Sequence, residues 1–308
     1  MNKTSQTITK IIATILCIIL FCVELTTFSI FAMGKFMTTK AIKESLKDVK
    51  VTDLLNGTEE NISYNIPKQA AAGTSPMNDI YRQAQNYGIS SEDVDKLMNS
   101  ETTKDLISEY LGSNAEYIIN GTEPLPLTGD EITKLFKENI DTISKEANIN
   151  LSEEQKANMI TVVEQNADKI ATTLPDSKKL SNEIDQNQLK MIRFMFSTTF
   201  KTILIVSIIL LAGLIALLRK SWYRWAMWTG ITTLLASLSI LLGGLIVTPI
   251  FNLIQEYMPS YLATLINGFI EVLGVQFLTV GGIGLPLAII QIVFAKITTN
   301  KLEPAKNK

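Results

Sequence analysis

The chain has 308 residues, 46% of them hydrophobic, and a formal net charge of −2. It has no histidine and only two cysteines, Cys17 and Cys22, which excludes His/Cys zinc sites, thiol catalysis and histidine acid–base chemistry. It also has no nucleophile motif and no phosphate-binding glycine loop. We therefore expect neither enzyme activity nor a cofactor or metal.

Four apolar runs are long enough to cross a bilayer, which needs about 20 helical residues. Because backbone polar groups in hydrocarbon must be satisfied within the segment, each run is expected to be a helix. The sequence predicts an all-α integral membrane protein, with a helical extracytoplasmic domain between its first and second transmembrane helices. The predicted spans are residues 11–33, 197–218, 226–247 and 272–295, and the domain with its stalks covers residues 34–196.

The placement of the cations predicts the orientation in the membrane. Cytoplasmic segments are enriched in Lys and Arg, and the outer loop 248–271 has neither residue. We therefore expect a multi-pass protein of the cell membrane with both termini in the cytoplasm. The basic cytoplasmic segments are the N-terminus 1–10 (Lys3, Lys10), the turn 219–225 (Arg219, Lys220, Arg224) and the tail 296–308 (Lys296, Lys301, Lys306, Lys308).

The first apolar run allows a second interpretation. Ile30-Phe31-Ala32 resembles a signal-peptidase site, and cleavage there would leave three spans. The run is longer than the 7–15 residues of a usual signal-peptide core, which favours a retained helix.

The domain between the first two spans is acidic and has helical patterns throughout. Ser90 or Ser91 and Thr128 are expected to cap helices, and Ser152 with Gln155 forms a capping-box pattern. Gly112 is expected to end a helix, and the break at residues 120–126 allows a division into two lobes.

Helical stalks are expected to join this domain to spans one and two. One stalk would continue the first span, and the other would run without a break into the second. We expect these stalks either to pack on the domain core or to transmit movement to the membrane. Their apolar positions are Ile42, Leu46 and Val49 in the first stalk, and Leu180, Ile184, Met191 and Met195 in the second.

Glu24 lies near the middle of the first span, where an acidic side chain is costly and must face protein or water. We favour an ion pair with Lys201 of span two. A protonated, neutral Glu24 is the next interpretation, and a proton-relay role is the least favoured. In span four, Gln276 and Gln291 are expected to form interhelical hydrogen bonds.

Small residues in span four predict a kinked helix that allows close contact. They are Gly281, Gly282 and Gly284, followed by Pro286, and this interpretation is favoured over a potassium-channel filter. The preceding loop, 249–270, is too apolar for a solvated segment. It predicts an interfacial amphipathic helix, broken at Pro259, that could also dock under the outer domain.

The order of one span, an outer domain and three further spans resembles that of bacterial ABC permeases of the cell-division and macrolide-exporter type. The resemblance is one of layout over the whole chain and implies passing the movement of an ATPase to an outer domain. The chain departs from that family in its bare turn at residues 218–225, where such permeases need a surface that engages the ATPase.

Two functions are therefore expected. The first is a non-enzymatic bacterial membrane protein whose outer helical domain binds a partner or senses the envelope. The second is a transport-related, permease-like subunit. The expected partners are the lipid bilayer and either another protein or further copies of the chain. Nucleic acid is not expected, because the basic residues are explained by topology.

Overall fold

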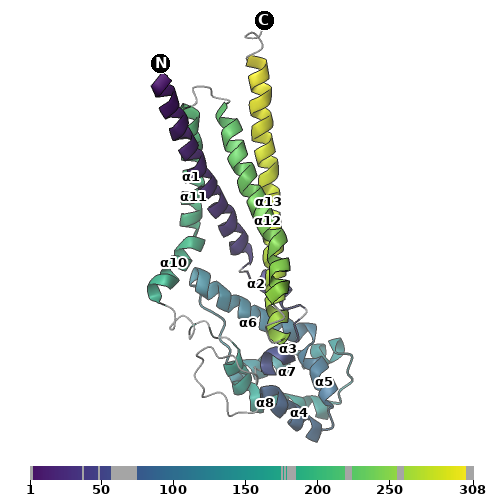
Figure 1. The fold of residues 1–308 in the computed structure, drawn as a ribbon. Helices are drawn as coiled ribbons and strands as arrows, with labels where there is room; N and C mark the ends of the chain where they lie inside the picture. Colours follow the sequence, from purple (N-terminus) through teal and green to yellow (C-terminus); the bar gives the residue numbers. More distant parts are fainter. Residues whose placement is uncertain are drawn as a thin grey trace. The chain divides into compact units, whose positions relative to one another are not determined.

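The computed structural model describes residues 3–36, 38–47, 49–56, 75–174, 176, 178, 185–218, 224–254 and 260–302. All regular secondary structure in these ranges is helical (Figure 1). The chain divides into two compact units. The first unit, which we call the bundle, comprises residues 1–36, 191–252 and 270–308. The second unit, which we call the helical domain, comprises residues 37–190 and 253–269.

Within the described ranges, four helices are long and apolar enough to cross a membrane. Their apolar segments are Thr7–Lys35, Thr198–Leu218, Arg224–Ile254 and Ile266–Thr299. Three predicted spans lie within these segments, and the second begins one residue before its segment, at Ser197. The helices are α1 (Lys3–Phe36), α11 (Thr198–Leu218), α12 (Arg224–Ile254) and α13 (Ser260–Leu302).

Two pairs of helices build the bundle. The α1 and α11 helices lie side by side around Cys17, Leu20 and Ile215 (Figure 1). The α12 and α13 helices approach so closely that a Cβ on Gly244 would lie 2.9 Å from the Gly274 carbonyl oxygen. Small residues repeat every seven positions along this contact, and they allow the two helix backbones to approach closely. These residues are Gly230, Ser237 and Gly244 on α12, and Gly274, Gly281 and Ala288 on α13.

The segment between the last two spans is helical in the residues that the structure describes, and its helices are continuous with those of the spans. The α12 helix continues to Ile254, and α13 begins at Ser260 and runs unbroken through the fourth span. At 43 residues, α13 is about 65 Å long, which is twice the thickness of the hydrocarbon core. Its first part belongs to the helical domain, where Phe269 packs on Ile42, Leu46 and Val49. Pro259 lies outside the described residues.

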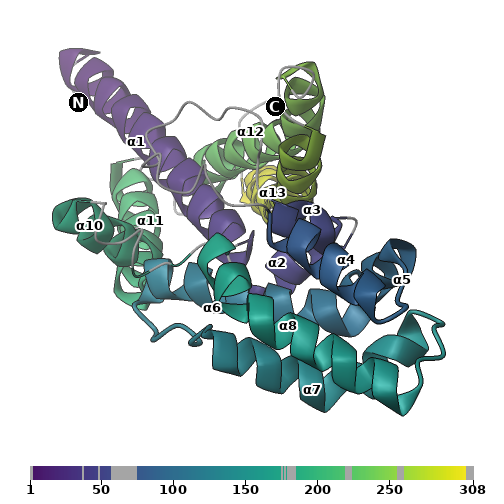
Figure 2. The same cartoon turned by 90° about the horizontal axis from the view of Figure 1, so that it is seen from below.

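The helical domain is built from short helices whose caps follow local sequence. Ser90, Thr128 and Ser152 are N-caps, and Ser152 with Gln155 forms the predicted capping box. The antiparallel pair of α7 and α8 lies against α4 and α6 (Figure 2). The helices are α2 (Thr39–Ser45), α3 (Val51–Asn56), α4 (Pro76–Asn86), α5 (Ser91–Met98), α6 (Glu101–Asn120), α7 (Gly129–Glu146) and α8 (Glu153–Thr173).

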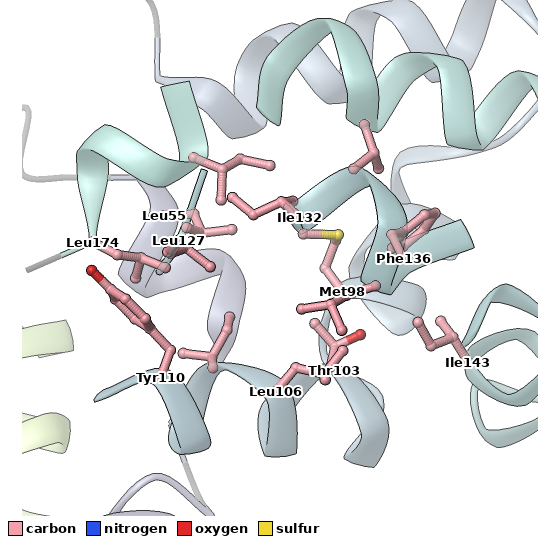
Figure 3. A pocket seen from close by; sticks show the side chains of 14 residues that line it. Leu55, Met98, Thr103, Leu106, Tyr110, Leu127, Ile132, Phe136, Ile143 and Leu174 are labelled. Carbon is pink, nitrogen blue, oxygen red and sulfur yellow. The ribbon is translucent and has the colours of Figure 1, made fainter. Parts of the chain in front are cut away.

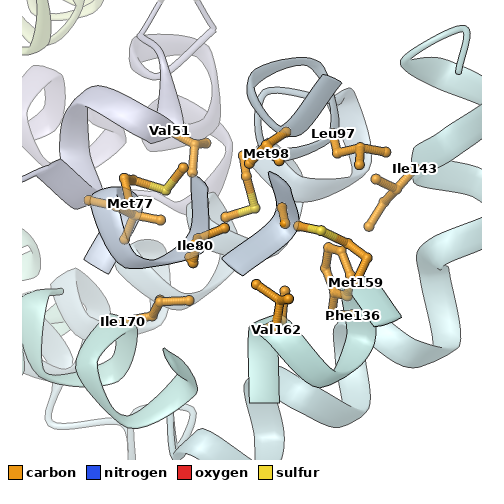
Figure 4. Packing of buried hydrophobic residues seen from close by; sticks show 14 of the residues in the cluster. Val51, Met77, Ile80, Leu97, Met98, Phe136, Ile143, Met159, Val162 and Ile170 are labelled. Atoms are coloured by element: carbon orange, nitrogen blue, oxygen red, sulfur yellow. The ribbon is translucent and has the colours of Figure 1, made fainter. Parts of the chain in front are cut away.

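The domain has one main core. Its buried residues come from both sides of the 120–126 break, so the two-lobe interpretation is wrong. Met77, Met98 and Met159 lie near its centre, where their flexible side chains fill the space between helices of different direction (Figure 4).

Gly112 does not end a helix. The α6 helix continues past it to Asn120 and ends at Gly121, which has a left-handed φ of 74°. A Cβ on Gly112 would lie 2.8 Å from the Cα of Thr39. The close approach of α2 to α6 therefore explains the glycine. The local sequence pattern around Gly112 does not indicate this contact.

Neither predicted stalk is continuous with its span. The α1 helix ends at Phe36, and α2 begins separately with Thr38 as its N-cap. Similarly, α10 (Gln186–Phe196) is separated from α11 by Ser197, whose hydroxyl accepts from the Phe200 amide as a cap does. Met191 on α10 is exposed, and Leu180 and Ile184 lie outside the described residues.

Candidate functional site

Two places in the structure combine burial with unusual chemistry. In the bundle, polar side chains gather between α1, α12 and α13, and we call this the polar cluster. In the helical domain, apolar side chains surround a pocket. The polar cluster comprises Glu24, Thr229, Thr232, Thr233, Ser237 and Gln291.

Glu24 is the only acidic member of the polar cluster. Glu24 is only 4% exposed, and its Oε1 lies 2.7 Å from Thr233 Oγ1 on α12. Thr233 Oγ1 also lies 2.9 Å from the Thr229 carbonyl oxygen, one turn earlier on the same helix. Glu24 Oε2 is fully buried and has no hydrogen-bond partner among the described residues. One carboxyl oxygen is thus held by a hydroxyl and the other is left without a partner.

The third helix closes the polar cluster through a glycine. A Cβ on Gly284 would lie 2.2 Å from Ser237 Oγ and 3.2 Å from the ring of Phe28. Phe28 follows Glu24 by one turn of α1, and Ser237 follows Thr233 by one turn of α12. Because α13 has a glycine at this position, α1 and α12 can meet next to Glu24.

The expected ion pair between Glu24 and Lys201 is not formed. Lys201 Nζ lies 5.9 Å from the centroid of the Phe31 ring, in a cation–π arrangement. Phe31 is two turns beyond Glu24, which is about 10 Å along the helix axis. The register between α1 and α11 therefore places Lys201 near the end of α1, and the partner of Glu24 comes from α12.

The remaining residues singled out in span four have different surroundings. Gln291 accepts an interhelical hydrogen bond from Thr229 at 3.0 Å. Gln276 is half-buried, and its side chain has no hydrogen bond with any described residue. Gly281 packs against Leu241 and the Ser237 carbonyl, as Gly284 does against Ser237 and Phe28, whereas Gly282 faces open space. The helix passes through Pro286 without ending.

The pocket of the helical domain contains about 580 Å³ of space not filled by atoms, including its opening to solvent. Side chains from several helices point into it (Figure 3). None of the lining residues is charged, and only Thr103 and Tyr110 have polar side-chain groups. The lining residues are Leu55, Met98, Thr103, Leu106, Ile107, Tyr110, Leu127, Ile132, Leu135, Phe136, Ile143, Val163, Ile170 and Leu174.

The two hydroxyls give the pocket little polar character. Thr103 Oγ1 already donates to the Leu97 carbonyl at 3.1 Å. The Tyr110 phenol is an uncharged hydroxyl at neutral pH, and burial raises its pKa further above the ordinary value of 10.0. The pocket therefore suits an apolar group and offers no partner for a charge.

The arrangement does not point to metal chemistry in the part of the chain that is described, where no three His, Cys, Asp or Glu residues cluster. The fold defines a helical protein with four candidate membrane-spanning helices and a separate helical unit. No protein-family model, curated protein or solved structure matches the chain.

Sequence patterns pointed to Glu24 but not to the pocket. The pocket's residues come from separate helices, and apolar residues at helical spacing do not distinguish a filled core from one with a cavity. The partner of Glu24 was also missed, because Thr233 is 209 positions away and threonine is common in this chain.

Proposed function

We propose that the protein is a membrane-anchored sensor whose helical domain lies on the extracytoplasmic side and binds an apolar ligand in its pocket. The observation that carries this proposal is the pocket itself, with its uncharged lining of leucine, isoleucine and aromatic side chains.

The chemistry of the lining favours a molecule with an acyl chain. A sugar, a nucleotide or a charged peptide would lose its hydrogen bonds with water and regain few of them here. An acyl chain loses none and gains about 25 cal/mol for each Å² of apolar surface removed from water. Lipids and lipid-modified molecules at the membrane surface provide this chemical group.

The extracytoplasmic location is supported by charge. The segments expected in the cytoplasm are basic, while residues 248–271 have no Lys or Arg. A single cysteine introduced at exposed Glu109 tests this location, with Cys17 and Cys22 replaced by alanine. A membrane-impermeant maleimide should label Glu109→Cys in intact cells, and labelling only after cell lysis would contradict the proposed side.

Ligand binding is tested by filling the pocket. Leu135→Trp should occlude it, whereas Leu125→Trp, at a residue 46% exposed and outside the lining, is the matched control. The full-length protein in lipid nanodiscs would be titrated with a fluorescent long-chain fatty acid. We expect saturable binding to the wild type and the control, and affinity at least about tenfold weaker for Leu135→Trp, equivalent to about 1.4 kcal/mol.

Equal affinity for the three proteins would contradict binding in the pocket. Circular dichroism and thermal unfolding should accompany the titration, so that loss of binding is attributed to occlusion only if Leu135→Trp is folded. Ile132→Trp provides a second filling variant from the same helix.

A permease-like role is the second candidate, and one observation favours it. The α13 helix contributes its first part to the helical domain and the rest to the bundle, so one continuous helix has residues in both units. Purification in mild detergent separates the two candidates. A co-purifying ATPase in stoichiometric amount would support the permease-like role and contradict a sensor that acts alone.

A further inference from the structure

The polar cluster poses a question of proton counting. A threonine hydroxyl has one proton to donate and two lone pairs that accept. Thr233 Oγ1 is within hydrogen-bond distance of two acceptors, Glu24 Oε1 at 2.7 Å and the Thr229 carbonyl oxygen at 2.9 Å. A single proton cannot serve both contacts. If Glu24 is ionised, one of the two pairs of oxygens has no proton between them.

A proton on Glu24 resolves this shortage. The carboxyl then donates from Oε1 to Thr233 Oγ1, and Thr233 donates to the Thr229 carbonyl. Each short contact receives one proton. The partnerless Oε2 becomes the carbonyl oxygen of a neutral acid, and burying it without a partner costs far less than burying half of a carboxylate.

No nearby charge offers an alternative way to stabilise a carboxylate. Apart from Glu24, the charged residues of the four candidate spans lie towards their ends. Lys201 on α11 is placed over Phe31, and no described cation forms an ion pair with Glu24. Apart from Glu24, the charged residues of the four candidate spans are Lys10 and Lys35 on α1, Lys201 on α11, Arg224 on α12, and Glu271 and Lys296 on α13.

We propose that Glu24 is a proton-binding site, in which a neutral carboxyl group donates a hydrogen bond to Thr233 and thereby joins α1 to α12. The ligand is a proton rather than a metal ion. A cation at this position would need several oxygen ligands, and the side chains around Glu24 provide hydroxyls already committed to backbone carbonyls, such as Thr232 to Thr229 at 2.7 Å and Ser237 to Thr233 at 2.7 Å.

Infrared spectroscopy of the full-length protein in nanodiscs tests this proposal. The wild type and Glu24→Gln would be compared at pH 7 in sodium buffer and in choline buffer. We expect the difference spectrum to contain the carbonyl stretch of a protonated carboxyl group, lost in Glu24→Gln and unchanged when choline replaces sodium. Glu271→Gln, at an exposed residue, is the control and should not remove this band.

Two results would overturn the proposal. The first is a difference spectrum with carboxylate bands in place of the protonated carbonyl stretch. The second is a Glu24 signal that changes on removal of sodium, which would indicate a cation site instead.

A second pair of variants keeps the test decisive if Glu24→Gln does not fold. Thr233→Val removes the acceptor hydroxyl, and Thr233→Ser retains it. The protonated carbonyl band should shift in Thr233→Val and keep its wild-type position in Thr233→Ser. An unshifted band in Thr233→Val would contradict the assigned hydrogen bond.

Discussion

The Cα of Thr39 lies 2.8 Å from the position that a Cβ on Gly112 would occupy, so α2 and α6 pack backbone against backbone at this point. Helix propensity alone predicts that Gly112→Ala stabilises α6 by about 1 kcal/mol. The close approach of Thr39 reverses this expectation. We expect Gly112→Ala to lower the free energy of unfolding by about 1–3 kcal/mol, because the Cβ forces the two helices apart.

Chemical denaturation of the full-length protein in micelles, followed by circular dichroism, measures this change. Glu109→Ala, at an exposed position of the same helix, is the control and should change stability by less than about 0.5 kcal/mol. A stabilised Gly112→Ala protein would show that α2 does not constrain α6 in solution.

Two glycines two residues apart on α13 provide an internal comparison. A Cβ on Gly284 would meet Ser237 and Phe28, whereas a Cβ on Gly282 would meet nothing within 4 Å. We expect Gly284→Ala to destabilise the bundle by about 1 kcal/mol or more, through overpacking. Gly282→Ala should be neutral or stabilising. Unfolding in mixed micelles with increasing SDS measures both, and equal effects would contradict the α1–α12–α13 contact.

Asp79 joins α4 to α8 within the helical domain. Its side chain is 6% exposed and accepts from Lys169 Nζ at 2.5 Å and from Arg82 at 2.8 Å. Because hydrogen bonds to charged groups contribute about 1.5–3 kcal/mol, Asp79→Ala should lower stability by about 2 kcal/mol. Glu92→Ala removes an exposed ion pair with Lys96 and should cost less than about 1 kcal/mol. Thermal unfolding of both variants tests this order, and similar losses would contradict it.

We expect the ionisation of Tyr81 to change the stability of the protein at high pH. Burial, the hydrogen bond to Asp95 and the charge of Asp95 raise the pKa of Tyr81 above its ordinary value of 10.0. The folded protein thus keeps the phenol neutral at a pH where the unfolded chain ionises. This contribution is present in full below about pH 10 and is lost as the pH rises from there towards the folded-state pKa.

Tyr81→Phe isolates this contribution, because phenylalanine does not titrate. The stability difference between the wild type and Tyr81→Phe should decrease above about pH 10. Denaturant unfolding of both proteins across this range measures it. A difference that stays constant through the range would show that the folded and unfolded states ionise Tyr81 alike.

Local patterns predicted what depends on neighbours in the sequence. Thr128 and Ser152 cap helices because their hydroxyls reach amides three residues away, as in any chain with that pattern. The same logic failed at Gly112, where a partner from α2 explains the glycine, and at Ser197, where a cap interrupts what looked like a continuous helix.

The four candidate spans follow from the sequence by itself, because a long apolar run satisfies its own backbone only as a helix and needs no partner to do so. Glu24 was likewise recognisable as exceptional from its position alone. Its partner, however, was decided by the tertiary structure. The packing of α1 against its neighbours places Glu24 next to Thr233 and Lys201 two turns away, near Phe31. The packing of the helical domain leaves the pocket unfilled. Both depend on how helices from distant parts of the chain meet, which no local pattern specifies.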